Sequence, residues 1–223
     1  MKTRLSRDTM ALRIAREFFD GAVVNLGIGI PTLASSYIPE GTTVIFHTEN
    51  GALGFGHVLL EEEAGKADIN LVNAGGQFVD RLPGMCFFNH AESFDMIRGG
   101  HIDITALGAF QISEKGDLAN WFYPPRGVGN IGGGMDLAFN AKRVIIAMEH
   151  TTKDGQPRVL KECTFPLTAP RCVDLIITDI AVIEVTEKGL VLKEVAPGWI
   201  PEEVQALTEP KLIIAEDLKE IEL

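Results

Sequence analysis

The stretch AVVNLGIGIPTL, residues 22–33, decides the fold, because within it the chain passes from strand to turn to helix. The run 22–26 is short and apolar, as in a buried strand. Gly27 and Gly29 follow as a glycine-rich turn. Pro31 fits the first turn of a helix, where its missing N–H is not needed. The stretch therefore predicts a strand–turn–helix unit of an α/β protein.

Beyond this unit, short apolar runs that resemble strands recur along the chain. Segments with helical character alternate with the first several of these runs. The predicted strands lie at 42–47, 69–72, 102–107, 143–148, 173–178, 181–185 and 190–195. Several are apolar on both faces, which is typical of parallel strands covered by helices. The last two, joined through 186–189, predict a hairpin. Helices are expected near 5–19 and from Pro201. We expect one α/β domain over 1–223, with a single open, mostly parallel sheet, helices on both faces and a C-terminal hairpin.

The charge balance limits the classes of partner. The chain has 223 residues, with 31 acidic against 20 basic side chains and a net charge of −11. Nucleic-acid binding needs clustered Lys and Arg, so no nucleic-acid partner is expected. Adhesion to an anionic membrane is disfavoured for the same reason. A small anionic ligand stays open, because one pocket can be positive on an acidic surface.

Cysteine and histidine usage gives no sign of a metal or a disulfide framework. The three cysteines include no CxxC pair, which favours a reducing compartment. His47-x-Glu49 and His101-x-Asp103 are spaced like metal ligands, but neither has a matching third ligand, so no metal site is expected. No secretory signal or run of about 20 apolar residues is evident. We expect a cytoplasmic protein without a membrane segment.

Glu49 is the first candidate for chemistry. It directly follows the predicted strand 42–47 and should therefore lie at that strand's carboxyl end, where open α/β sheets bind ligands. Asn50 and Gly51 form a turn pair whose backbone readily takes positive φ. A glutamate on so tight a turn is exposed to ligand yet firmly aimed. From spacing alone, an ordinary solvated turn glutamate stays an alternative.

The glycine turn at 27–32 is a second candidate. Successive backbone N–H groups at a helix start can bind an anion or oxyanion. A dinucleotide motif GxGxxG would need glycine where Thr32 stands, although Glu49 lies 22 positions after Gly27, near the spacing of that fingerprint. An NAD-binding oxidoreductase is therefore one alternative, and a purely structural turn is another.

A third candidate is the glycine loop that ends in Gly132, Gly133 and Gly134. Three consecutive glycines cost backbone entropy, so a close approach to another group is expected there. A helix is predicted from Met135, and its free N–H donors would face a ligand. The alternative is a mobile surface loop.

Taken together, these elements resemble the B-type half of family I coenzyme A transferases, the 3-oxoacid CoA-transferase group. The similarity runs nearly end to end through VNLGIGIPTL (24–33), ENG (49–51), NAGG (73–76), FDMIRGGHIDIT (94–105), GDLANW (116–121), GGGMDL (132–137), ITDIAV (177–182) and APG (196–198). The chain departs from the family pattern at three positions. Thr48 stands for a usual serine, Ala52 for a bulky aliphatic residue and Gly134 for a usual alanine. The resemblance implies a CoA transferase fold, like that of ribose-5-phosphate isomerase.

The resemblance also implies a ping-pong reaction in which the Glu49 carboxylate forms a covalent thioester with CoA. Such chemistry suits glutamate, because its carboxylate can act as nucleophile and as leaving group. By similarity, the oxyanion donors are expected to be the Asn25 side-chain amide and the backbone of Gly132 and Gly133. Further positions expected to contact CoA are Gly27, Gly29, Asn50, Gly51 and Gly134. No permanently bound cofactor is expected, and CoA enters as a substrate.

The partner expected from the resemblance is a CoA-transferase A subunit that supplies the other half of the active site. We expect a hetero-oligomer, A₂B₂ or larger, with little activity from the B-type chain alone. Succinyl-CoA with acetoacetate is the preferred substrate pair, and acetate or butyrate against acetoacetyl-CoA is the alternative. A non-catalytic protein that only stabilises another chain is the remaining alternative, and the intact Glu49 and glycine loop argue against it.

Overall fold

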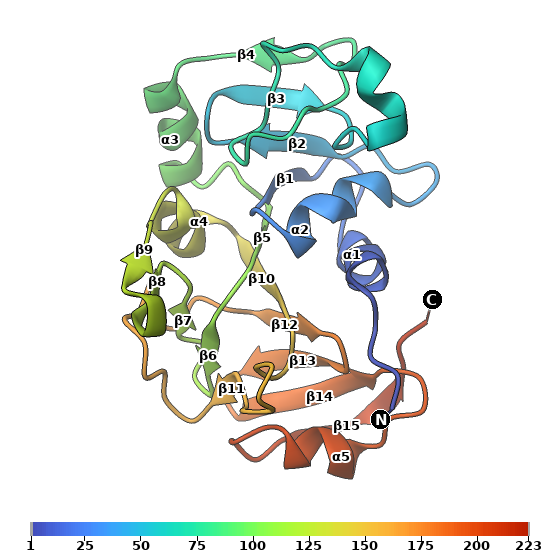
Figure 1. The fold of residues 1–223 in the computed structure, drawn as a ribbon, viewed down its shortest axis with the longest axis vertical. Helices are drawn as coiled ribbons and strands as arrows, with labels where there is room; N and C mark the ends of the chain where they lie inside the picture. The colour runs from blue at the N-terminus through green and yellow to red at the C-terminus, as the bar shows by residue number, and fades with distance from the viewer. Residues whose placement is uncertain (1, 223) are drawn as a thin grey trace.

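The structure, a computed structural model, describes residues 2–222 and is built on a ten-stranded sheet (Figure 1). In spatial order the strands are β15 (Ile213–Glu220), β14 (Gly189–Val195), β13 (Ala181–Thr186), β12 (Leu175–Thr178), β10 (Arg143–Met148), β5 (Ile104–Leu107), β1 (Val23–Leu26), β2 (Ile45–Thr48), β3 (Ala52–Phe55) and β4 (Cys86–Phe87). The five central strands, β12, β10, β5, β1 and β2, pair in parallel. Strands β3 and β4 on one side, and β13 and β14 on the other, continue the sheet antiparallel. The expected open, mostly parallel sheet is confirmed.

Helices cover both faces of the parallel centre. They are α1 (Arg7–Ala15), α2 (Ile30–Leu33), α3 (His90–Arg98), α4 (Gly134–Asn140) and α5 (Pro201–Ala206), with short 3₁₀ turns at η1 (Ala34–Ser36), η2 (Glu61–Lys66) and η3 (Pro124–Arg126). Figure 1 shows α1 and α2 on one side of the sheet and α3 and α4 on the other. Within residues 2–222, no helix is long and apolar enough to cross a membrane.

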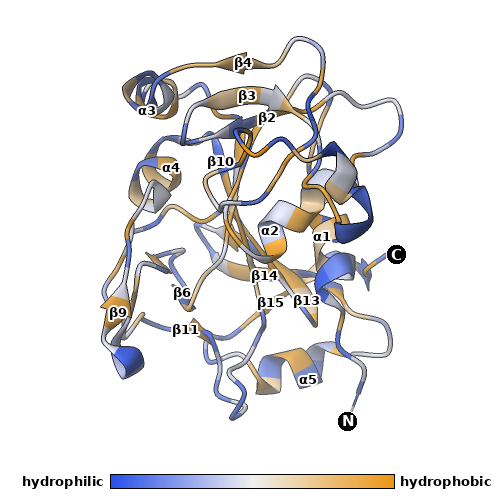
Figure 2. Cartoon of the chain, turned by 45° about the horizontal axis from the view of Figure 1, so that its top comes forward, coloured by the Kyte–Doolittle hydropathy of each residue, from blue (hydrophilic) through white to orange (hydrophobic). Residues whose placement is uncertain are grey.

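Alternating side chains of the central strands explain the two covered faces. In β10, Ile145 and Ala147 pack into the core shared with α1 and α2, whereas Val144 and Ile146 pack into the core shared with α3 and α4. All four are buried, so this strand is apolar on both faces. Figure 2 shows the same hydrophobic colouring along the central strands, while the helices carry a mixture of hydrophobic and hydrophilic residues.

The strand–turn–helix unit forms as the sequence predicts. Strand β1 leads through the turn into α2, with Pro31 in the first turn of the helix. Gly29 precedes that helix at φ 103°, a conformation that L side chains rarely adopt. The predicted hairpin is also confirmed as β13 and β14, which join the main sheet. The opening helix α1 is shorter than the expected 5–19.

One predicted strand is absent, and one strand that forms was not predicted. The stretch 69–72 does not form a strand: Ile69 is 84% exposed, and only Val72 makes a single bridge, to Phe78. The acidic tail, in contrast, does form a strand, β15, which pairs in parallel with β14 at the sheet edge. Its side chains are mostly exposed, so it carries little hydrophobic signal. Two smaller sheets complete the fold: β6 (Gln111–Ser113), β7 (Leu118–Ala119) and β11 (Val159–Leu160) form one, and β8 (Phe122–Tyr123) and β9 (Val128–Gly129) form the other.

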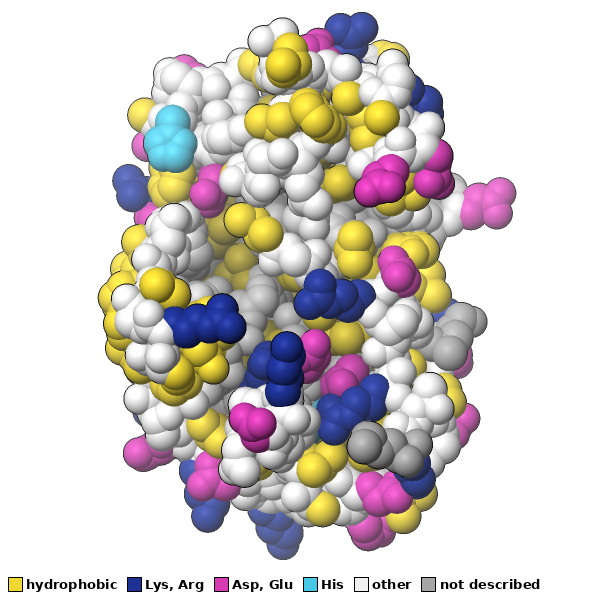
Figure 3. Space-filling model, viewed as in Figure 1, with side chains coloured by type: hydrophobic (Ala, Val, Ile, Leu, Met, Phe, Trp, Pro, Cys, Tyr) yellow, Lys and Arg dark blue, Asp and Glu magenta, His cyan; other side chains and the backbone are white. Residues whose placement is uncertain are grey.

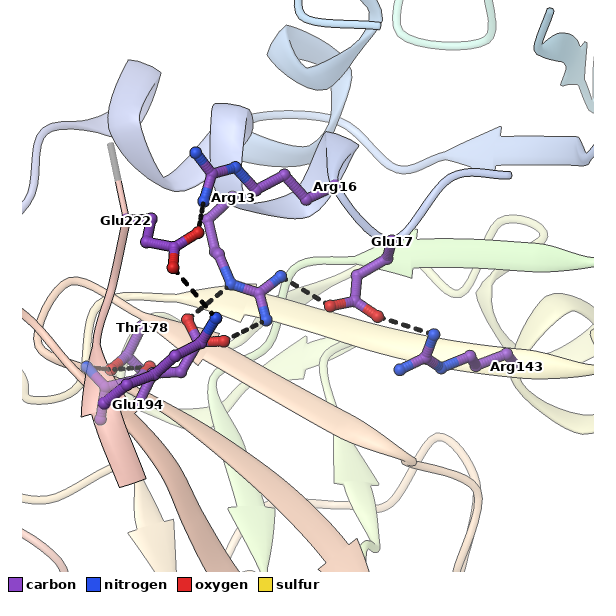
Figure 4. A network of polar contacts seen from close by, with 9 residues as sticks. Arg13, Arg16, Glu17, Arg143, Thr178, Glu194 and Glu222 are labelled. Atoms are coloured by element: carbon purple, nitrogen blue, oxygen red, sulfur yellow. Dashed lines mark hydrogen bonds and ion pairs between the residues drawn. The ribbon is translucent and has the colours of Figure 1, made fainter. Parts of the chain in front are cut away.

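A buried charge network fixes α1 to the sheet (Figure 4). The Arg13 guanidinium donates to both carboxylate oxygens of Glu194 in β14, at 2.8 and 2.9 Å, and to Glu17 at 2.6 Å. Glu17 also pairs with Arg143, at the start of β10, at 2.7 Å. Arg13 and Glu194 are each only 8% exposed. The network therefore ties the first helix to two strands that are far apart in the sequence.

We predict that Glu194→Ala destabilises the fold strongly, because it leaves the Arg13 guanidinium buried with only Glu17 as its partner. Breaking a buried ion pair on one side costs about 3 kcal/mol or more of unfolding free energy, measured by urea denaturation. The control is Glu222→Ala, whose exposed pair with Arg16 spans 3.5 Å and should contribute less than about 1 kcal/mol. Equal unfolding free energies for the two variants would contradict the role of the network.

Candidate functional site

Glu49 lies on a tight turn directly after β2, as the sequence predicts. Gly51 has φ 113°, and a Cβ there would come 2.1 Å from the carbonyl oxygen of Phe88, so only glycine fits. The Asn50 side chain donates to the Val72 carbonyl oxygen at 2.8 Å. Thr48 keeps the hydroxyl of the usual serine and uses it to accept a hydrogen bond from the Ala74 N–H at 2.8 Å. The turn is thus held on three sides.

A cavity of about 620 Å³ opens beside Glu49 at the carboxyl ends of the parallel strands. Its floor comes from the ends of four neighbouring strands, represented by Glu49 after β2, Asn25 in β1, Gly108 after β5 and Met148 in β10. This volume lies within the usual range for small-molecule sites, and the edge is where open α/β sheets bind their ligands.

The structure brings most of the expected site residues together around this cavity, but not all. Those that line it are Glu49, Asn25, Gly27, Gly132, Gly133 and Gly134. Three others, Gly29, Asn50 and Gly51, do not line it. Gly29 and Gly51 instead have positive φ in the two turns that shape its edge, and Asn50 holds the turn of Glu49. Their place in the structure is that of turn formers.

The glycine loop meets Glu49 directly. The backbone of Gly133 lies against the Glu49 carboxylate and favours its charged form. A Cβ at Gly133 would lie 1.8 Å from Oε2 of Glu49, so no other residue fits without moving the carboxylate. Gly132 has φ 47°, and Gly134 faces the Asn120 side chain instead, at 3.8 Å from a built Cβ. Helix α4 begins at Gly134, so free N–H groups of its first turn lie near the carboxylate.

The environment of Glu49 raises the pKa of its carboxyl group. Burial is the main cause, because it disfavours the charged form, and nearby Asp136 adds to it. The charge of His90 and the Gly133 N–H act in the opposite direction. His90 starts helix α3, and its Nδ1 lies 3.1 Å from the Glu49 backbone oxygen. A half-buried carboxylate is less solvated than one in water and is correspondingly more reactive toward a carbonyl carbon.

Behind Glu49, Asn25 is hydrogen-bonded to a buried histidine. Its side-chain nitrogen lies 3.1 Å from Nδ1 of His47 and 3.2 Å from the His47 backbone oxygen. The carbonyl oxygen can only accept, so the amide nitrogen must face it. The Asn25 amide nitrogen therefore faces His47 in this structure, and its expected contact with an oxyanion stays a prediction. Nε2 of His47 lies 3.0 Å from the Ser93 hydroxyl.

Sequence reasoning missed several residues of the cavity. Asn120, Arg7, Arg158 and Glu149 all line it, and His90 contacts the turn of Glu49. Only Asn120 lies within one of the family-like strings, GDLANW. None of the others has a spacing that links it to Glu49, because the cavity is assembled from loops that follow different strands.

The metal-like spacings and the dinucleotide alternative gain no support from the geometry. Asp103 accepts from the Val23 N–H and pairs with Lys142, and His47 is hydrogen-bonded to Asn25. Within residues 2–222, no group of three or more His, Cys, Asp or Glu is placed to bind a metal. The hydroxyl of Thr32 closes the glycine turn through the Gly29 oxygen at 2.8 Å.

Comparison with known proteins gives a consistent result. The sequence profile of the family "Coenzyme A transferase" matches residues 7–207. The chain is 47% identical over 213 residues to the B-type chain of 3-oxoadipate CoA-transferase from Acinetobacter baylyi, covering 95% of this chain and 97% of that protein. It is 44% identical to the beta chain of acetate CoA-transferase from Escherichia coli, covering 96% of each.

A longer relative matches only in part. The chain is 50% identical to mouse mitochondrial succinyl-CoA:3-ketoacid coenzyme A transferase 2B, covering 96% of this chain but 41% of that protein. Solved structures share the fold at low sequence identity. The acyl-CoA transferase YdiF of Escherichia coli O157:H7 superposes with a TM-score of 0.75 at 21% identity, covering 98% of this chain and 43% of that one. Glutaconate coenzyme A-transferase of Acidaminococcus fermentans gives 0.71 at 20% identity, covering 100% and 91%.

We predict that the buried His47 makes the fold sensitive to acid. Burial lowers the pKa of His47 to about 4, below the usual value near 6.5. Below pH 6.5 the unfolded chain therefore takes up a proton that the folded chain does not. Stability is complete above that pH and falls as the pH drops toward 4, by up to about 3 kcal/mol for this residue.

The measurement is urea unfolding of the natural chain and of His47→Gln between pH 7 and pH 4. The other buried histidine, His150, is present in both chains and cancels in the difference. The natural chain should lose stability faster than the variant. Parallel pH profiles would show that His47 titrates normally in the fold.

Proposed function

Because this chain belongs to the coenzyme A transferase family, we propose that it carries the nucleophile of an enzyme that moves CoA between an acyl-CoA and a short-chain 3-oxo carboxylate. One observation carries the proposal. The carboxylate of Glu49 lies in a cavity at the sheet edge, and the backbone of Gly133 lies directly against it. No side chain can be added at Gly133 without displacing that carboxylate.

The chemistry follows from a carboxylate that is both nucleophile and leaving group. An oxygen of Glu49 attacks the thioester carbonyl carbon, the C–S bond breaks, and CoA thiolate departs to leave a mixed anhydride. The thiolate then attacks the glutamyl carbonyl carbon. The anhydride C–O bond breaks, which leaves CoA on Glu49 as a thioester and releases the first carboxylic acid as its anion. A second carboxylate reverses these steps and leaves as the new acyl-CoA.

Each attack develops negative charge on a carbonyl oxygen, so fixed N–H donors should lower the barrier. Gly133 is the donor best supported, because its backbone lies directly against the Glu49 carboxylate. Gly132 precedes it in the loop and is the second candidate. Asn25 also lines the cavity, but its side-chain amide nitrogen is hydrogen-bonded to His47. As an oxyanion donor it would first have to leave His47.

The substrate class follows from what the similar proteins are named for. One acts on 3-oxoadipate, another pairs succinyl-CoA with a 3-ketoacid, and a third acts on acetate. Two of these three names share a keto group at C3. We therefore keep succinyl-CoA with acetoacetate as the preferred pair, with 3-oxoadipate as a close variant of the acceptor. Acetate or butyrate against acetoacetyl-CoA is the alternative.

The partner is proposed to be an A-type chain. The bacterial relatives that match over their whole length are named as one of two subunits, B or beta, whereas this chain matches 41% of the longer mouse enzyme. The simplest account is that a second polypeptide supplies the remaining part. We propose a hetero-oligomer of A₂B₂ type or larger, in which the A-type chain completes the cavity beside Glu49.

We predict that Glu49→Gln abolishes covalent transfer, because an amide cannot form the anhydride or release CoA. The complex co-expressed with its A-type partner is incubated with succinyl-CoA, and the peptide that contains residue 49 is weighed by mass spectrometry. The natural complex should gain the mass of CoA there. The variant should gain none and should lose at least about 1,000-fold in transfer rate. Undiminished turnover by a variant whose amide stays intact would refute the mechanism.

We predict that Gly133→Ala lowers the transfer rate by about 100-fold or more, because its methyl group would displace the Glu49 carboxylate and disturb an oxyanion donor. Gly134→Ala is the matched comparison. Its methyl group would meet only Asn120 at an ordinary 3.8 Å, so this variant should keep far more activity. Steady-state rates of the two assembled complexes test this. Similar losses in both would show that the loop tolerates no side chain anywhere, for reasons unrelated to Glu49.

A further inference from the structure

Arg158 is a partly buried arginine whose side chain has no hydrogen-bonding partner among residues 2–222. The side chain is 24% exposed, and its nearest carboxylate, Glu149, lies at 3.8 Å, beyond hydrogen-bond distance. Three other arginines show how closely such pairs form in this fold. The more deeply buried Arg13 and the more exposed Arg4 and Arg143 reach carboxylates at 2.8 Å or less. The guanidinium has five N–H donors, and those of Arg158 are open to solvent or to a ligand.

This arginine faces the cavity that contains Glu49. Arg158 and Glu149 both line the cavity, and so does Arg7, the exposed first residue of α1. In Figure 3, Lys and Arg side chains gather beside the central hollow of a protein whose net charge is −11. The charged residues of the cavity lining are two arginines, Arg7 and Arg158, and two glutamates, Glu49 and Glu149, and of these only the arginines offer donors to an anion. The cavity wall around Arg158 is therefore suited to an anionic ligand.

The strand order sets the distance between the two ends of the cavity. Glu49 follows β2, and Glu149 follows β10, with β1 and β5 between these two strands. Three strand spacings separate them, which is roughly 14 Å along the sheet edge. Arg158 is attached on the β10 side, because its backbone N–H donates to the His150 oxygen at 3.1 Å. Arg158 therefore enters the cavity from the end opposite Glu49.

We propose that Arg158, with Arg7 in the same cavity, forms an anion subsite for the charged group at the far end of a bound acyl-CoA. The inference rests on the proposed function for the identity of that ligand. With the thioester carbonyl at Glu49, two kinds of anion can lie at a distance: the second carboxylate of a dicarboxylic acyl group, or a phosphate of CoA. The planar guanidinium fork suits either one through paired hydrogen bonds. An anion can displace Glu149 from Arg158 at little cost, because the two charged groups are 3.8 Å apart and the Glu149 side chain is 45% exposed.

The test is binding to the assembled complex with the A-type partner, measured by calorimetry, for the natural enzyme and for Arg158→Gln. Four probes separate the sources: succinate against butyrate, and CoA against pantetheine, which lacks the phosphates. A carboxylate subsite predicts that the variant binds succinate about 10- to 100-fold more weakly and the other three normally. A phosphate subsite predicts the same loss for CoA alone. Arg81→Gln, an exposed arginine outside this cavity, is the control and should bind all four normally.

Two results would overturn the subsite. The variant could bind all four probes as the natural complex does, or it could lose affinity for all four, including neutral pantetheine. If Arg158→Gln fails to assemble, Arg7→Gln decides the question, because Arg7 is exposed and its loss should weaken the same probe by several-fold. Binding is measured without turnover. A complex that binds in this way but transfers no CoA would refute the proposed function and leave the subsite standing.

Discussion

Parallel pairing of the central strands is the constraint on which the rest of the molecule depends. Because β2, β1, β5 and β10 run in the same direction, their carboxyl ends meet at one edge of the sheet. Every loop that follows these strands therefore opens into a common space. The pairing is stable because the strands are apolar on both faces and helices cover each face. The cavity is a consequence of this arrangement rather than of any single loop.

Within that space, the proposed chemistry depends on one close contact, between the carboxylate of Glu49 and the backbone of Gly133. The contact requires glycine at two positions, because a side chain at either would clash. Gly51 allows the tight turn after β2, and Gly133 leaves room for the carboxylate. Ordering these glycines costs conformational entropy, and it fixes the Gly133 backbone beside the Glu49 carboxylate. The half-buried setting keeps the donor strong, since water competes less for it.

Charge is distributed in two ways in this acidic chain. Away from the cavity, carboxylates hold arginines in place, as Glu194 and Glu17 do for Arg13. At the cavity the carboxylates hold the arginines less firmly, and Arg158 has only a long contact to Glu149. Arg13 is thus neutralised within the chain, whereas the role proposed for Arg158 is to bind a ligand.

The sequence alone determined the α/β class, the strand–turn–helix unit at 22–33, the C-terminal hairpin and the position of Glu49 at a strand end, because each follows from local periodicity and turn chemistry. It failed where the signal is not local. Strand β15 is mostly exposed and forms because β14 offers an edge to pair with. Only the tertiary structure decided that Arg158 shares a cavity with Glu49, and that the Asn25 amide turns toward His47. Those contacts join residues that are far apart along the chain. Residue spacing predicts only contacts within one strand, turn or helix, so it cannot predict these.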